Sequence, residues 1–134
     1  MSRRVINPPS MYPSVPFGFS HAVEQQSGRT LHLAGQVAWN AKGELVGAQD
    51  LLAQTRQVLL NLKEVLHCAG AVPADVVRLR TYVVNHSPEH LADVCALISE
   101  FYEGAEPAAN SFIGVQALAL PDFLIEIEAT ACLD

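Results

Sequence analysis

Two glutamates near the C-terminus could carry acid–base chemistry. Glu126 and Glu128 stand two residues apart in a run where apolar and polar side chains alternate. Such alternation is typical of a strand, and this spacing places both carboxylates on one face, about 7 Å apart. The pair could therefore act as a two-acid site. The alternative is that both form ion pairs with Arg78 and Arg80, which share a face of another predicted strand.

Other reactive side chains give weaker signals. His86 and His90 are four residues apart, but Ser87-Pro88 starts a helix between them and there is no evident third ligand, so we expect no metal site. Cys95 lies in an apolar helical stripe, where a buried thiol and a thiol that lines a cleft give the same pattern. Ala34-Gly35-Gln36 combines a glycine that permits close backbone approach with an amide. The GxGxxG, P-loop, GxSxG and HExxH motifs are absent, and we expect no cofactor.

Two predicted helices must position these residues. Apolar residues recur with helical spacing from Leu51 to Ala69, with Asp50 as the N-cap and Gly70 as the residue that closes the end. A second helix is predicted to begin at Ser87-Pro88 and to end near Gly104.

The strands are predicted from alternation and turn residues. Residues 19–23 and 30–34 are expected to form a hairpin that turns at Gly28. Further strands are predicted over residues 37–39, 76–85, 110–118 and 123–133, the first extending the hairpin into a meander and the last two pairing with each other. The first 18 residues contain four prolines, and we expect them to run over the surface without pairing. This order predicts an α+β domain with two helices on one face of a sheet.

Composition and charge limit the possible functions. The chain has 134 residues, of which 50% are hydrophobic and 16% charged, and its formal net charge is −6. This length predicts one domain that spans residues 1–134. Residues 81–134 contain no Lys or Arg and the eight earlier basic residues are scattered, which disfavours nucleic acid as a partner. Because few charges are available for the surface, we expect a homo-oligomer.

The sequence also predicts a cytoplasmic protein without membrane contact. Residues 5–23 lack charged side chains, but four prolines interrupt them, so they fit neither a membrane span nor a signal-peptide core. Cys68, Cys95 and Cys132 are an odd number without CxxC spacing, which predicts reduced thiols packed as small hydrophobes.

Taken together, several motifs resemble the RidA (YjgF) superfamily of imine and enamine deaminases. In order, they are Phe19-Ser20-His21-Ala22-Val23, Leu33-Ala34-Gly35-Gln36-Val37, the helix from Gln54 to Lys63, Ala69-Gly70-Ala71, Asp75-Val76-Val77, and Pro121 to Ala129. The resemblance covers nearly the whole chain. It implies a chorismate-mutase-like fold, a mixed sheet with two helices on one face, and a homotrimer whose sheets face inward. It also implies three ligand sites in the clefts between subunits.

The resemblance implies site residues as well. In active family members, a glutamate on the last strand positions the water that attacks the C=N carbon, and Glu126 stands at that position. An arginine in a Pro-Ala-Arg-Ser stretch binds the carboxylate of a 2-imino acid, but here Asn110 takes its place. Further cleft positions are Phe19 where tyrosine is common, Ala34 for serine, Gly35, Cys95 for asparagine, and Phe112 for a small residue or cysteine.

The missing arginine changes the expected ligand. Losing a bidentate, charge-assisted contact costs about 1.5 to 3 kcal/mol, or at least about tenfold in binding. Asn110 can still hydrogen-bond a neutral group. We therefore expect a small, neutral or weakly polar metabolite, and hydrolysis or tautomerisation of an imine, enamine or related carbonyl compound rather than ordinary 2-imino acid deamination.

Two other functions are alternatives. One is a non-catalytic trimer that senses a metabolite or acts as a chaperone, suggested by the missing arginine and the apolar cleft positions. The other, a ribonuclease or translation inhibitor, comes only from labels attached to the family that the chain resembles, and the charge distribution disfavours it. If the cleft binds an anion, the cation must come from the first 80 residues, either of the same subunit or of a neighbouring one.

Overall fold

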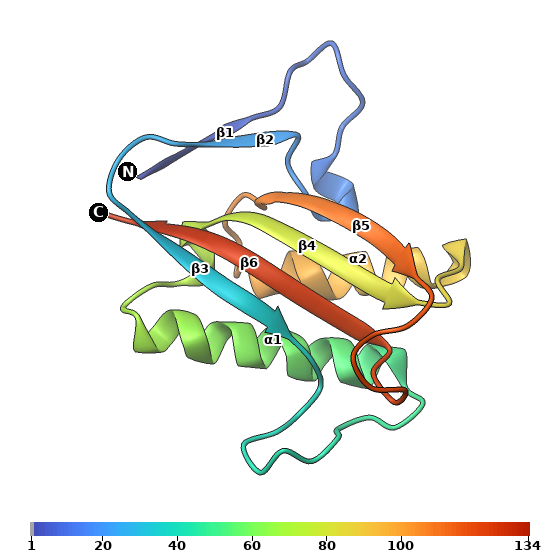
Figure 1. Cartoon of the computed structure of the whole chain (residues 1–134). Helices are drawn as coiled ribbons and strands as arrows, with labels where there is room; N and C mark the ends of the chain where they lie inside the picture. The colour runs from blue at the N-terminus through green and yellow to red at the C-terminus, as the bar shows by residue number, and fades with distance from the viewer. Residues whose placement is uncertain (1) are drawn as a thin grey trace.

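A four-stranded sheet forms the centre of the fold, and both helices cover one of its faces (Figure 1). The computed structural model describes residues 2–134. The strands are β3 (Arg29–Gln36), β4 (Val76–Val84), β5 (Ala109–Val115) and β6 (Ile125–Leu133), in the spatial order β3-β6-β4-β5. β6 runs antiparallel to β3 and β4, whereas β4 and β5 are parallel. The predicted α+β class with a mixed sheet is confirmed.

Both predicted helices form close to their expected bounds. α1 spans Leu51–Cys68, and the Asp50 side chain accepts a hydrogen bond from the Ala53 backbone N–H at its start. Gly70 follows its end with a φ of 78°, a left-handed conformation that glycine adopts without strain. α2 spans Pro88–Phe101. α1 lies under β3 and β6, and α2 lies under β4 and β5 (Figure 1).

The hydrophobic core fills the space between the helices and the sheet. Alternate residues of the strands face it, because successive side chains of a strand point to opposite faces. The core residues from the sheet include Leu33, Leu79, Val83, Ile125 and Ile127, and those from the helices include Val58, Leu62, Leu66, Val94, Ile98 and Phe101. Each large apolar side chain stabilises the fold by roughly 1.5 to 3 kcal/mol. The other sheet face carries Arg80 and Glu128 and has no helix over it.

A buried glutamine fixes the start of α1 against two loops. The Gln54 side chain has no exposed surface. Its amide nitrogen donates to the backbone oxygens of Gly47 (3.1 Å) and Asp122 (3.0 Å), and its oxygen accepts from Leu124 N–H (2.9 Å). This side chain therefore holds the chain in place just before β6, where Glu126 lies.

The N-terminal segment differs from the prediction. β1 (Arg3–Ile6) pairs antiparallel with β2 (Ala22–Gln25), so the expectation that the first 18 residues form no ladder was wrong. The prolines begin only at Pro8, which leaves the four residues of β1 free to donate and accept. A 3-10 turn, η1 (Val15–Phe17), follows, and a second short turn, η2 (Pro73–Asp75), precedes β4.

The predicted N-terminal hairpin was also wrong. β2 pairs with β1, whereas β3 pairs with β6. The turn at Gly28, where φ is 90°, moves the chain from one sheet to the other, and an added Cβ would lie 1.7 Å from the Leu133 carbonyl oxygen. The later turn is as predicted, since Gly43 N–H donates to Asn40 O at 3.0 Å, but residues 37–39 form only an isolated bridge, between Trp39 and Leu45.

The last two strands do not pair with each other, contrary to the prediction. β5 and β6 lie on opposite sides of β4. The reason is the connection through α2, because a strand that returns through a helix lies parallel to the strand before it. β4, α2 and β5 make such a unit, and β6 then fills the remaining side of β4.

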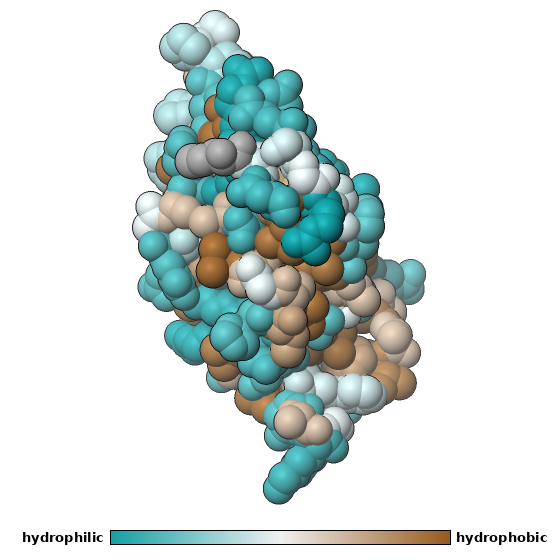
Figure 2. Space-filling model, turned by 90° about the vertical axis from the view of Figure 1, so that its left-hand side faces the viewer, coloured by the Kyte–Doolittle hydropathy of each residue, from teal (hydrophilic) through white to brown (hydrophobic). Residues whose placement is uncertain are grey.

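Some large apolar side chains reach the surface. At the end of the molecule that carries the termini, Figure 2 shows them in small groups among polar side chains. A larger group lies in residues 11–17, where Met11, Tyr12, Val15 and Phe17 are between 44% and 58% exposed. No helix within residues 2–134 has the length and apolar content that crossing a membrane requires.

Candidate functional site

A cavity of about 360 Å³ lies beside β5, on the face of the sheet that α2 covers. Phe19, Cys95, Asn110 and Phe112 line it, so the structure brings four of the predicted binding residues together. The lining is completed by Tyr12, Phe17 and Leu91, which the sequence reasoning did not identify. Tyr12 and Phe17 gave only the signal of large apolar side chains in a proline-rich segment, and Leu91 gave only that of the apolar stripe of the second helix.

Secondary structure sets two walls of the cavity. Asn110 and Phe112 are two apart on β5 and therefore point to the same side of the sheet. Leu91 and Cys95 are four apart on α2 and therefore lie on one face of that helix. Cys95 is half-buried there, which agrees with a thiol that lines a cleft. The edge of β5 and the facing side of α2 form these two walls.

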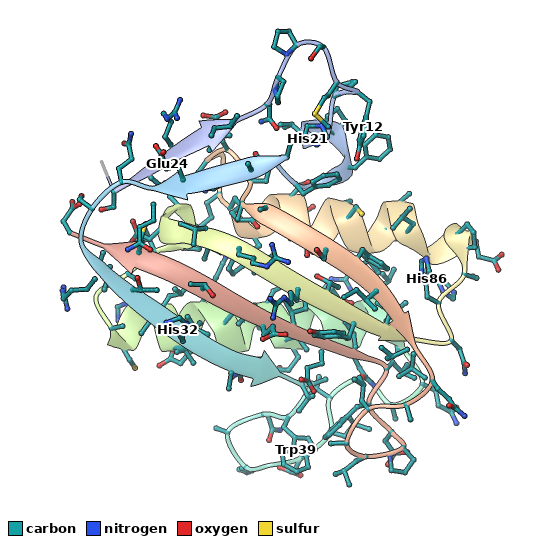
Figure 3. All side chains as sticks on the ribbon, turned by 45° about the horizontal axis from the view of Figure 1, so that its top comes forward. Tyr12, His21, Glu24, His32, Trp39 and His86 are labelled. Atoms are coloured by element: carbon teal, nitrogen blue, oxygen red, sulfur yellow. The ribbon has the colours of Figure 1, made fainter. Side chains whose placement is uncertain are left out.

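The third wall is the segment before β2, and polar contacts hold it in place. The Asn7 side-chain oxygen accepts from Ser14 Oγ (3.1 Å) and from His21 N–H (2.8 Å). A His21 ring nitrogen lies 2.8 Å from the Tyr12 carbonyl oxygen, and the two rings meet edge to face at 4.7 Å. Figure 3 shows Tyr12 and His21 side by side above the sheet. These contacts hold residues 7–21 together as a loop, which forms the third wall of the cavity.

Gly18 lets this segment approach α2 closely. Its φ is 85°, and an added Cβ would lie 2.9 Å from the Cys95 carbonyl oxygen and 3.1 Å from Ser99 Oγ. Only glycine fits this position without moving the helix or the segment. Gly18 therefore brings Phe17 and Phe19 to the cavity.

Asn110 supplies the amide of the cavity. The Thr81 hydroxyl donates to Asn110 Oδ1 at 3.2 Å, and Thr81 is fully buried. This contact uses one lone pair of the amide oxygen and orients the amide, and the N–H₂ group donates no hydrogen bond within residues 2–134, so it is available to a ligand. Burial raises the pKa of the Cys95 thiol, so the thiol stays neutral at pH 7.

A second group of predicted residues lies elsewhere, at the junction of β3 and β6. The pairing of these strands is irregular between Leu33 and Gln36, which places Ala34 and Gly35 in a bulge. A Cβ on Gly35 would lie 2.2 Å from Glu126 Oε2. The glycine therefore makes room for the Glu126 side chain, as the sequence suggested for a residue that permits close approach. Ala34 is exposed beside it.

Glu126 and Glu128 have different surroundings. Glu128 accepts a hydrogen bond from the Tyr82 hydroxyl at 2.5 Å and lies 3.7 Å from an Arg80 nitrogen, as the ion-pair alternative predicted for it. Among residues 2–134, Glu126 takes part in none of the ion pairs. Burial, and then the nearby charge of Glu128, raise the pKa of Glu126. Glu126 is thus a half-buried carboxylate with raised proton affinity.

The two groups of residues lie on opposite faces of the sheet. Asn110 is opposite Leu79, a core residue, so its side chain is on the helix side. Glu126 is opposite Tyr82, whose hydroxyl contacts Glu128 on the uncovered side. Directly opposite residues in neighbouring strands share a face. Within one chain, Asn110 and Glu126 therefore cannot contact the same small ligand.

The remaining histidines and cysteines do not join either group as ligands. His86 contacts Phe112 with ring centroids 4.9 Å apart, and His90 is exposed. His32 lies on β3, far from His86 in Figure 3. Within residues 2–134, no three His, Cys, Asp or Glu side chains come together as metal ligands. Cys132 is buried as predicted, but Cys68 is exposed at the end of α1, so the expectation of a packed thiol was wrong there.

Comparison with known proteins gives consistent matches. Residues 11–133 match the family model described as Endoribonuclease L-PSP. A RutC family protein of Pyrococcus horikoshii is 36% identical over 115 residues, which cover 84% of this chain and 85% of that protein. A 2-iminobutanoate/2-iminopropanoate deaminase of Dermatophagoides farinae is 26% identical over 132 residues, 98% of each chain. The crystal structure of YyfB from Yersinia pestis, a protein of unknown function in the conserved Rid family, is 83% identical with a TM-score of 0.98, covering 99% of this chain and 100% of that one.

Proposed function

The chain belongs to the endoribonuclease L-PSP family, which includes the RidA (YjgF) proteins, and from this we propose that it hydrolyses or tautomerises a small uncharged imine, enamine or related carbonyl compound. The compound binds in clefts between the subunits of a homotrimer. The observation that carries this proposal is the placement of Asn110 and Glu126 on opposite faces of one sheet.

A second copy of the chain completes the site. The uncovered sheet face of one copy bears Glu126, and the cavity beside β5 of another copy bears Asn110. When the first face packs against the β5 edge of the second copy, both side chains meet one ligand. The contact is head-to-tail, and three repeats of such a contact close a ring. The sheets then face inward and the helices lie outside.

The two residues have separate roles in the reaction. The Asn110 amide donates a hydrogen bond to the imine nitrogen or carbonyl oxygen of the ligand. The Glu126 carboxylate accepts a hydrogen bond from water and directs the water oxygen at the C=N carbon. Addition of water gives a carbinolamine, which releases ammonia or an amine and leaves a carbonyl compound. The raised pKa of Glu126 makes it a stronger proton acceptor than an exposed glutamate.

The cavity favours an uncharged compound. Its lining contains no Asp, Glu, Lys or Arg. A carboxylate that entered it would lose water without gaining a cation, which is unfavourable in a partly apolar site. Arg80, on the uncovered face, already pairs with Glu128. This is why we propose a neutral imine rather than the 2-imino acids that carry a carboxylate.

The test compares neutral and charged imines. An amine oxidase generates neutral imines from primary amines, an amino-acid oxidase generates 2-imino acids, and the decay of each is followed with and without the protein. We expect faster decay of the neutral imines and loss of the effect in Glu126→Gln. Glu64→Gln, an exposed carboxylate on α1, is the matched control and should retain the wild-type rate.

Two outcomes would contradict the proposal. An acceleration that is unchanged in Glu126→Gln would exclude the assigned mechanism. Ligand binding without acceleration of any imine would leave the non-catalytic sensor as the better account. Asn110→Arg should add activity toward 2-imino acids, because it restores a bidentate partner for a carboxylate at this position.

A further inference from the structure

The cavity beside β5 is bounded by aromatic rings on two sides. Phe19 and Tyr12 meet edge to face on one side, with centroids 6.4 Å apart, and Phe112 lies on the other side against His86. Tyr12 is 58% exposed and Phe17 is 53% exposed, so much of this aromatic surface is still in contact with water. Aromatic surface of this kind favours a ring that stacks offset or edge to face against it.

Few polar groups line the cavity. The Thr81 hydroxyl holds the Asn110 amide by its oxygen, and the N–H₂ group, which donates no hydrogen bond within residues 2–134, is available to an acceptor on a ligand. The other polar groups of the lining are the Cys95 thiol, which is at most a weak donor or acceptor, and the hydroxyl of Tyr12, a side chain that is 58% exposed. The Asn110 amide is thus the hydrogen-bond donor that β5 offers to a ligand, and within one chain the lining has no cation for a carboxylate.

We propose that the natural ligand is an uncharged molecule with an aromatic ring and one strong hydrogen-bond acceptor, such as an aryl-substituted ketone, aldehyde or imine. The ring lies between Phe19 and Phe112, and the acceptor faces Asn110. This inference rests on the proposed function for the location of the site, but binding alone can test it.

Four small compounds separate the effect of an aromatic ring on binding from the effect of a carboxylate charge. Phenylacetone has the ring and a neutral carbonyl, phenylpyruvate adds a carboxylate, and acetone and pyruvate are the corresponding compounds without the ring. Binding to the full chain is measured by calorimetry or by ligand-detected NMR. We expect phenylacetone to bind at least about thirtyfold more tightly than acetone, because the ring leaves water. It should also bind at least about tenfold more tightly than phenylpyruvate.

Propylbenzene, which has the ring but no acceptor, tests the role of Asn110. In the wild-type chain it should bind roughly tenfold more weakly than phenylacetone. In Asn110→Leu the two compounds should bind equally, with propylbenzene unchanged. In Thr81→Val the amide is free to turn, and the preference for phenylacetone should fall. Circular dichroism of each variant confirms folding, and Cys95→Trp, which fills the cavity, should abolish binding of both compounds.

A second apolar groove between α1 and α2 provides the control for location. It is lined by Leu60, Leu97 and Phe101 together with charged side chains. Leu60→Ala should leave the binding of phenylacetone unchanged. If Leu60→Ala weakens binding and Asn110→Leu does not, the compound binds in that groove and the inference is wrong.

The outcomes also separate this inference from the proposed function. Equal affinity for phenylacetone and acetone, or for phenylacetone and phenylpyruvate, would overturn the ligand class even if Glu126 proved catalytic. Preferential binding of phenylacetone without turnover of any imine would support the ligand class and overturn the proposed function.

Discussion

Glu126 and Glu128 are both glutamates on the same face of β6, yet only Glu126 remains available for chemistry. Glu128 is engaged by Tyr82 and Arg80, whereas Glu126 lies over the backbone of Gly35. The alternation of the strand predicted the shared face but not the partners. The partners depend on the register of β6 against β4 and β3, which no local pattern contains.

Gly35→Ala should disable Glu126 without unfolding the protein. The added Cβ would lie 2.2 Å from Glu126 Oε2, so the carboxylate must move. We expect imine turnover to fall about as far as in Glu126→Gln, roughly 10² -fold or more. The measurement is a double-mutant cycle. If the glycine acts through the carboxylate, the double variant should be no slower than Glu126→Gln alone, and additive losses would show that Gly35 acts in another way.

Glu128→Gln should change the pH dependence of turnover. The reaction needs the Glu126 carboxylate, so the rate falls when pH drops through the pKa of this residue. Burial and the charge of Glu128 raise that pKa. Removing the charge removes the second cause, and the acidic limb of the rate profile should shift to lower pH. A limb that stays in place or moves to higher pH would show that Glu128 does not influence the essential group.

At the scale of elements, local signals were sufficient for α1, α2 and β4. Asp50 and Gly70 mark the two ends of α1, and Ser87-Pro88 marks the start of α2. These residues give local signals because caps and prolines act on neighbouring backbone groups. Strand partners were harder to predict. β1 escaped notice because it is only four residues long, and β5 was paired with β6 although the α2 crossover required it to run beside β4.

The segment that closes the cavity depends on contacts that are distant in sequence. Asn7 holds Ser14 and His21, and Gly18 contacts the backbone of α2. None of these residues carries a motif on its own. The resemblance to a family predicted Phe19 as a cleft residue, but it did not extend to Tyr12, Phe17 and Leu91.

Gly18→Ala should weaken ligand binding more than it weakens the fold. The alanine clashes with Cys95 O and adopts a φ of 85°, so the segment that carries Phe17 and Phe19 must lift from α2. Gly104→Ala is a matched control, because its φ is 89° and nothing lies within 4 Å of an added Cβ. Both variants should lose about 1 kcal/mol of stability from backbone strain. Only Gly18→Ala should lose affinity for phenylacetone, and equal losses in calorimetry would contradict the role given to this segment.

At the scale of the whole molecule, the uncovered sheet face is the main feature that one chain leaves unexplained. It bears Arg80, Tyr82 and Glu128, and Ile113 on it is 37% exposed. The low charge content of the sequence predicted an oligomer, and the family resemblance predicted inward-facing sheets. The sequence could not show that Asn110 and Glu126 belong to opposite faces, because that follows from the order of the strands.

Ile113→Asp should convert a trimer to monomers. A charge placed in the contact between subunits would be buried without a partner, which is strongly unfavourable. Analytical ultracentrifugation of the wild-type chain should give three times the monomer mass, and of the variant a monomer with unchanged circular dichroism. Leu60→Asp places the same charge on the outer side of α1, where Leu60 is 59% exposed, and should remain trimeric. A trimeric Ile113→Asp would place the subunit contact on another surface.

The most direct test of the account is whether two defective chains restore one site. Asn110→Leu and Glu126→Gln chains are co-expressed with different tags, and mixed trimers are isolated by both tags. If each cleft takes its cavity from one subunit and its glutamate from the next, every mixed ring contains a single intact cleft. The mixed trimers should then turn over a neutral imine at about one third of the wild-type rate, whereas each variant alone is nearly inactive. Mixed trimers that are as inactive as the parent variants would contradict a site shared between subunits.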